Sequence, residues 1–116
     1  MHSEHFQISE AVLNDLLEMK SEGKPIIAVG TTVVRVLESL ALENYQRHSG
    51  WTDIFIYPPY EFRLVDGMLT NFHLPNSTLM MLVSAFCGRT NLLRAYQEAA
   101  QERYRFFSYG DCMLIL

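Results

Sequence analysis

The chain has 116 residues, of which 49% are hydrophobic and 19% are charged, and its formal net charge is −4 at pH 7. This length fits one domain or part of a larger one, and the apolar fraction excludes an intrinsically disordered chain. The negative net charge excludes a uniformly basic surface of the kind that binds nucleic acid. Any contact with RNA would therefore depend on a local patch or on sequence outside this chain.

The N-terminal sequence and the two cysteines favour a soluble protein of a reducing compartment. The opening residues, MHSEHFQISE, lack the apolar segment of a signal peptide, and no apolar run reaches the ~18 residues that a membrane span needs. Cys87 and Cys112 lack the spacing of a metal site, so buried free thiols are expected in preference to a disulfide. We therefore expect a cytoplasmic protein that does not contact a membrane.

Hydrophobic periodicity in the first half of the chain predicts the order helix, strand, helix. Ser9 is expected to cap a helix that runs to about Ser21, because apolar residues recur there on one face. Residues 25–29 (PIIAV) predict a strand buried on both faces, and a second helix is expected from Val33 to about Tyr45. This order is typical of α/β folds with parallel strands.

The middle of the chain predicts a β-hairpin. Asp66-Gly67 lies between two runs of alternating apolar residues, and this dipeptide favours the tight turn of a hairpin. In that register Phe62 would lie opposite Asn71, and both Asn71 and His73 would share an otherwise apolar face. Polar side chains on such a face need partners from the protein or from a ligand.

The remaining elements complete a single α/β unit over residues 1–116. A strand is expected over 51–57, where Pro58 and Pro59 end it. A helix is expected over 79–86, with Asn76, Ser77 and Thr78 as caps and Gly88 at its end, followed by a helix capped by Thr90 or Asn91. A turn at Ser108 to Asp111 and an apolar C-terminal strand complete the chain. We therefore expect an α/β fold: a mixed sheet with flanking helices and one β-hairpin.

Gly30, Thr31, Thr32 and Arg35 form the first candidate site. A glycine and two hydroxyl residues between a strand and a helix present free backbone N–H groups at the positive end of the helix dipole. Such a place suits phosphate or carboxylate, to which Arg35 could add a bidentate contact. The alternative is an ordinary turn with a threonine cap and an exposed arginine.

Asn71, His73, Ser77 and Thr78 form the second candidate site. Histidine can act as a general acid or base near neutral pH, and asparagine can orient a hydroxyl group or a base. The alternative is a histidine that is hydrogen-bonded within the core beside two capping hydroxyl groups.

The two termini supply weaker candidates. His2 and Glu4 would lie on one face of an extended segment with His5 nearby, which suits metal binding or proton transfer, although a frayed terminus is the alternative. Near the C-terminus, Arg105, Ser108, Tyr109 and Asp111 surround a glycine turn. The aromatic residues Phe106, Phe107 and Tyr109 could stack on a base, or belong to the core.

Four stretches taken together are more specific than any single residue. They read MHSEHFQIS, IIAVGTTVVRVLES, NFHLPNSTLMMLVSAF and YRFFSYGDCMLIL. The chain resembles, over its whole length, the C-terminal part of the S-adenosylmethionine:tRNA ribosyltransferase-isomerase family of queuosine biosynthesis. The resemblance implies that residues 1–116 are the C-terminal portion of a larger α/β catalytic domain.

The resemblance also implies an activity. The family transfers the ribosyl portion of S-adenosylmethionine, which is a substrate, to 7-aminomethyl-7-deazaguanine at the wobble position of tRNA. It isomerises the sugar to give epoxyqueuosine and releases adenine and methionine, with no metal implied. On this basis His73 would transfer a proton, Asn71 would orient a sugar hydroxyl or base, and His2 with Glu4 would supply a second acid–base pair. The substrate-binding set would be Gly30, Thr31, Thr32, Arg35, Ser77, Thr78 and Asp111.

Two departures from the family pattern qualify this hypothesis. Pro58-Pro59-Tyr60 stands where relatives typically have Pro-Gly-Tyr, which could alter substrate preference. The family's enzymes are also much longer, so we expect an inactive fragment that contacts tRNA mainly through the missing part and self-associates through unpaired strand edges. The alternative is a nucleotide- or anion-binding module or paralogue that kept this half of the pocket without the chemistry.

Overall fold

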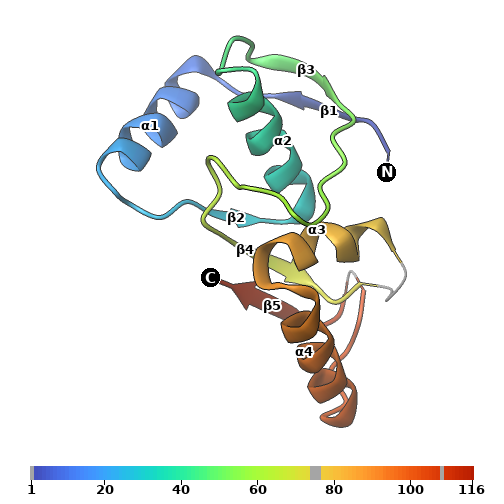
Figure 1. Cartoon of the computed structure of the whole chain (residues 1–116). Coiled ribbons are helices and arrows are strands. Elements are labelled where there is room, and N and C mark those ends of the chain that lie inside the picture. Colours follow the sequence, from blue (N-terminus) through green and yellow to red (C-terminus); the bar gives the residue numbers. More distant parts are fainter. Residues whose placement is uncertain (1, 74–76, 108) are drawn as a thin grey trace.

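The computed structural model describes residues 2–73, 77–107 and 109–116, and it has an α/β fold (Figure 1). The helices are α1 (Glu10–Ser21), α2 (Thr31–Leu42), α3 (Thr78–Cys87) and α4 (Arg89–Gln101). The strands are β1 (Glu4–Gln7), β2 (Ile27–Val29), β3 (Ser49–Thr52), β4 (Gly67–Asn71) and β5 (Cys112–Ile115). The predicted α/β class, with mixed strand directions and flanking helices, is confirmed. In the described part of the chain, no helix has the length and apolar character needed to span a bilayer.

β4 is the central strand of a three-stranded sheet. It pairs in parallel with β2, where Val29 lies opposite Leu69, and antiparallel with β5, where Asn71 lies opposite Cys112. β1 and β3 form a separate antiparallel pair. Because β2 and β4 are parallel, both end at the same edge of the sheet, where α2 also begins (Figure 1). Polar residues at the ends of these strands are therefore brought together.

The hairpin predicted at Asp66-Gly67 is wrong. β4 begins at Gly67 and pairs with β2 and β5, whereas residues 60–66 form no strand, so the predicted register of Asn71 is wrong as well. Gly67 is needed for close approach, since a Cβ atom there would lie 2.6 Å from the carbonyl oxygen of Ile115. Asp66 accepts hydrogen bonds from the Ile26 backbone N–H and from Lys20 Nζ, both at 2.8 Å. The dipeptide thus starts a central strand instead of turning a hairpin.

Two predicted strands differ from those observed. β2 is not buried on both faces, because only Ala28 is buried and Val29 is 66% exposed at the edge of the sheet. β3 ends at Thr52, and the chain from residue 53 to residue 57 continues without strand pairing. The predicted extension of the β4 segment through Leu74 to Pro75 lies outside the described residues.

The helices agree better with prediction. Ser9 caps α1, since its Oγ accepts a hydrogen bond from the Val12 N–H at 3.1 Å. α3 ends at Gly88 as predicted, but α4 begins directly after that glycine, so the predicted cap at Thr90 or Asn91 is wrong. The predicted cap Asn76 and the first residue of the predicted turn, Ser108, lie outside the described residues.

α2 differs from its predicted helix in its start and in the residues that it buries. It starts at Thr31, two residues earlier than predicted, and Val33 is 41% exposed. Its buried face instead includes three polar residues, Arg35, Glu38 and Ser39. The Glu38 carboxylate is fully buried and accepts four hydrogen bonds, from the Tyr60 hydroxyl group and from the backbone N–H groups of the three residues that begin at Arg63. Glu38 therefore fixes the irregular segment that leads into β4.

The Tyr60 hydroxyl group donates to the buried Glu38 carboxylate. Loss of solvent, and secondarily the Glu38 charge, raises the pKa of Tyr60 to about 12, so the hydroxyl group remains a donor at neutral pH. Glu38→Ala would remove the acceptor of all four hydrogen bonds and leave buried backbone N–H groups unpaired.

We therefore predict that Glu38→Ala lowers the free energy of unfolding by about 3–5 kcal/mol. Tyr60→Phe is the matched control, because it removes a single donor and should cost about 1 kcal/mol. Urea unfolding followed by circular dichroism measures both values. Equal losses in the two variants would contradict the central role of the Glu38 carboxylate.

Candidate active site

The end of β2 and the start of α2 form the first part of the site. Gly30 has φ 97°, and its N–H donates to the Leu69 carbonyl oxygen at 2.8 Å, so the turn is held against β4. No side chain caps the first turn of α2, and Thr32 is exposed while Thr31 is half-buried. The N–H groups at the positive end of the α2 dipole thus face the same edge as the end of β4, an arrangement that favours an anion.

Arg35 is buried, which contradicts the alternative of an exposed arginine. It is 3% exposed and donates through Nε to the Ile54 carbonyl oxygen at 3.2 Å and through Nη2 to the His2 carbonyl oxygen at 2.7 Å. Its Nη1 lies 3.7 Å from Glu4 Oε1. The guanidinium group therefore holds the N-terminal segment against the first turns of α2, and its direct contact with a ligand stays a prediction.

The N-terminal residues are ordered by this contact and by strand pairing. Phe6 in β1 is buried, so the alternative of a frayed terminus is wrong for the described residues from His2 onward. His2 and Glu4 both approach Arg35, whereas His5 packs edge-on against Trp51 with ring centroids 5.2 Å apart. Arg35 therefore contacts the His2 backbone and the Glu4 carboxylate, whereas the His5 ring packs elsewhere.

Asn71 and Asp111 meet at the end of β4. The Asn71 side-chain Nδ2 donates to the Asp111 carbonyl oxygen at 3.3 Å. The Asp111 carboxylate accepts from the Arg105 N–H at 2.7 Å, and the Asp111 N–H donates to the Arg105 carbonyl oxygen at the same distance. Asp111 thus closes the C-terminal loop onto β4, and any substrate contact by its carboxylate would have to coexist with this bond.

His73 lies just beyond β4 in a half-buried environment. Its backbone N–H donates to the Tyr96 hydroxyl oxygen at 2.7 Å, and its Nε2 lies 2.9 Å from Thr70 Oγ1. Burial lowers the pKa of His73 and raises the pKa of Tyr96. At neutral pH the imidazole is therefore uncharged, which is the state that a general base requires.

Ser77 and Thr78 lie at the start of α3, a few residues after His73. Ser77 occupies the N-cap position without making a side-chain cap, and its buried Oγ has no hydrogen-bond partner among the described residues. Thr78 is the first residue of α3. A buried hydroxyl group without a partner is costly unless something else supplies the hydrogen bond, which a bound ligand could do.

Two positions that organise this site were missed by sequence reasoning. Glu38 fixes the approach to β4, and Tyr96 holds the His73 backbone. Glu38 had a detectable signal, because Val34, Leu37, Glu38 and Ala41 recur at helical spacing and place the carboxylate on the buried face. Tyr96 had no such signal, because its bond to His73 joins residues far apart in sequence.

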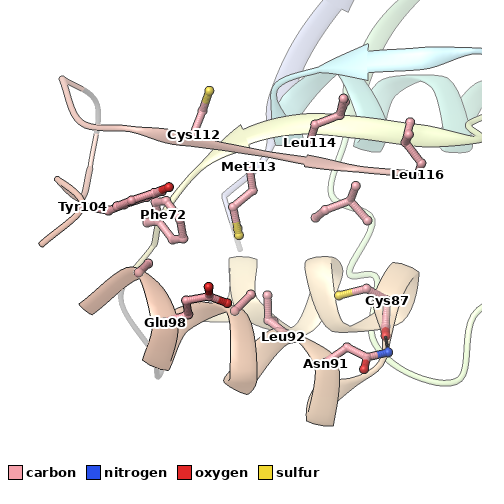
Figure 2. A pocket seen from close by; sticks show the side chains of 13 residues that line it. Phe72, Cys87, Asn91, Leu92, Glu98, Tyr104, Cys112, Met113, Leu114 and Leu116 are labelled. Atoms are coloured by element: carbon pink, nitrogen blue, oxygen red, sulfur yellow. Dashed lines mark hydrogen bonds between the residues drawn. The ribbon is translucent and has the colours of Figure 1, made fainter. Parts of the chain in front are cut away.

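A groove of about 550 Å³ lies between α4 and β5, with Phe72 and Cys112 in its lining. Figure 2 shows Met113 pointing from β5 toward α4 and Leu92, while Cys112 points to the opposite side of β5. Both cysteines are free, as predicted, but Cys87 is half-buried and Cys112 is exposed, so the expected burial is wrong for Cys112. Within the described ranges, no three His, Cys, Asp or Glu side chains are grouped as metal ligands would be.

A family model described as "Queuosine biosynthesis protein" matches residues 1–115 of this chain. The chain belongs to this family. A Halothermothrix orenii relative named S-adenosylmethionine:tRNA ribosyltransferase-isomerase is 58% identical over 100% of this chain and 35% of its own length. A relative of the same name from Thermotoga maritima is 54% identical, again over 100% of this chain and 35% of its own length.

A solved structure agrees with the sequence comparisons. The crystal structure of S-adenosylmethionine tRNA ribosyltransferase from Thermotoga maritima has a TM-score of 0.90 and is 51% identical, over 97% of this chain and 40% of that chain. The family resemblance inferred from the motifs is therefore confirmed. The present chain spans only about 35% of the curated queuosine biosynthesis relatives that it matches.

The lowered pKa of His73 predicts how the stability of the protein depends on pH. Because the pKa lies below the ordinary value of 6.5, the unfolded chain takes up a proton more readily than the folded chain. His73 thus contributes stability above pH 6.5 that is lost as the pH falls through the lowered pKa.

NMR titration of the His73 ring protons, assigned by comparison with His73→Gln, should give a midpoint below pH 6.5. The difference in unfolding free energy between wild type and His73→Gln should shrink at acidic pH. A midpoint at or above 6.5 would contradict the neutral, desolvated imidazole.

Proposed function

We propose that this chain forms part of the catalytic domain of an S-adenosylmethionine:tRNA ribosyltransferase-isomerase. The reaction moves the ribosyl group of S-adenosylmethionine onto 7-aminomethyl-7-deazaguanine in tRNA and isomerises the sugar, releasing adenine and methionine. The observation that carries the proposal is 58% identity over the whole chain to a relative with that name. The Gly30 turn, which is held against β4, and Arg35, which holds the N-terminal segment beside α2, support it.

The methionine carboxylate is proposed to bind at the start of α2. There the backbone N–H groups of Thr31 and Thr32 lie in the first turn without a side-chain cap, and the helix dipole favours a negative charge. In this proposal, the main role of Arg35 is to position other residues. It holds His2 and Glu4 beside α2, so that an exposed imidazole and a carboxylate are available as a second acid–base pair.

His73 is proposed to remove the acidic proton next to the sulfonium centre. Its pKa is lowered by burial, which keeps the imidazole neutral and able to accept a proton at physiological pH. Asn71 uses Nδ2 to hold Asp111, and its Oδ1 remains for a sugar hydroxyl or a base. The Ser77 hydroxyl and Thr78 would complete the substrate contacts from the start of α3.

The remaining proposals concern partners and context. The protein would act in the cytoplasm on S-adenosylmethionine and tRNA, with most tRNA contacts made by parts of the enzyme beyond this chain. The isolated chain would be inactive and would self-associate through β2 and β5, the outer strands of the sheet, where Val29 and Leu114 are 66% and 59% exposed. Pro58-Pro59-Tyr60 is proposed to tune substrate preference.

The test uses the complete open reading frame that encodes this chain. His73→Ala should reduce adenine release from S-adenosylmethionine in the presence of tRNA by about 10²–10⁴-fold, since general acid–base catalysis contributes that much. Circular dichroism should show an intact fold. His48→Ala is the matched control, because His48 is exposed and precedes β3, and this variant should retain activity.

Near-wild-type turnover of His73→Ala would overturn the assignment of His73. Binding of S-adenosylmethionine without adenine release by the wild-type protein would favour a nucleotide-binding module without the chemistry.

A further inference from the structure

The backbone before β5 is strained at Phe107. Phe107 has φ 69°, a left-handed conformation that is rare for a bulky residue. The surrounding hydrogen bonds enforce it, because the Phe107 N–H donates to the Phe72 carbonyl oxygen at 3.0 Å and its own carbonyl accepts from the Gly110 N–H at 2.9 Å. Strain of this kind persists where the surroundings impose it, and it concentrates at binding and catalytic sites.

The same loop is closed tightly at its base. Two hydrogen bonds join Arg105 and Asp111. The Asp111 N–H donates to the Arg105 carbonyl oxygen, and the Arg105 N–H donates to the Asp111 carboxylate, both at 2.7 Å. A Cβ atom at Gly110 would lie 2.5 Å from the carbonyl oxygens of Arg105 and Phe106, so only glycine fits there. The Asn71 side chain anchors this base to the end of β4.

The aromatic rings of this loop divide between core and solvent. Phe106 points inward, with its ring centroid 4.9 Å from that of Phe72 and 5.7 Å from that of Tyr96. Phe107 and Tyr109 point outward and are 55% and 99% exposed. Arg105 beside them is also exposed. Phe107 and Tyr109 therefore present two solvent-facing rings beside the exposed Arg105, and hydrogen bonds tie this part of the chain to Phe72 and Asn71.

We propose that Phe107 and Tyr109 form a stacking surface for unpaired RNA bases, with Arg105 contacting a phosphate. This inference rests on the proposed function and names where the tRNA substrate meets this chain. A base that undergoes chemistry must leave its stack, and bases unstacked beside it gain new partners in aromatic side chains. Because the chain's net charge is −4, RNA would have to bind at a local patch such as this one.

The test measures RNA affinity with the complete open reading frame. Fluorescence anisotropy with a labelled anticodon stem-loop should show roughly five- to hundredfold weaker binding for Tyr109→Ala, the range expected for loss of one stacked base. Tyr109→Phe is the matched control, because it keeps the ring and removes only the hydroxyl group. It should bind as the wild type does.

Three results would overturn the inference in distinguishable ways. Unchanged affinity of Tyr109→Ala, in a protein whose wild type releases adenine, overturns the stacking surface and leaves the proposed function standing. A lowered unfolding midpoint without a change in affinity shows that the ring packs against protein instead of RNA. A wild-type protein that neither binds the stem-loop nor releases adenine removes the proposed function and this inference together.

Discussion

The structure depends on one buried carboxylate. Glu38 lies on the inner face of α2 and accepts four hydrogen bonds from the irregular segment that includes Tyr60 and leads to β4. That segment has no strand or helix of its own, so its backbone N–H groups need an acceptor from elsewhere. Because β4 is the central strand and carries Asn71 at its end, the position of the proposed site follows from this single interaction.

α2 joins three distant parts of the chain along its length. Its first turn follows Gly30 and presents free N–H groups, its Arg35 binds the N-terminal segment, and its Glu38 binds the approach to β4. Polar side chains bound to backbone groups, and not apolar packing alone, therefore set the geometry. Ion pairs and hydrogen bonds of this kind fix one arrangement because any other leaves buried charge without a partner.

Features that depend on residues close in sequence were predicted correctly, whereas features that depend on residues far apart in sequence were not. Local features were predictable: Ser9 caps its own helix, Gly88 ends α3, and the family motifs identify the relatives. Asp66-Gly67 misled because its role depends on Ile26 and on the neighbouring strand β5, which lie far away in sequence. The roles of the candidate site residues stay predictions. The burial of Arg35 could not be foreseen, since its hydrogen-bond partners are backbone carbonyl groups.

The most direct measurement of the central claim is hydrogen–deuterium exchange of the complete open reading frame with and without S-adenosylmethionine. If the substrate binds where β2 and β4 end, peptides covering the start of α2 and the end of β4 should exchange more slowly in its presence. Peptides covering α4 and β5, which line the groove between them, should be unchanged. Protection confined to α4 and β5, with no change at Gly30 to Thr32 or Asn71, would contradict the account.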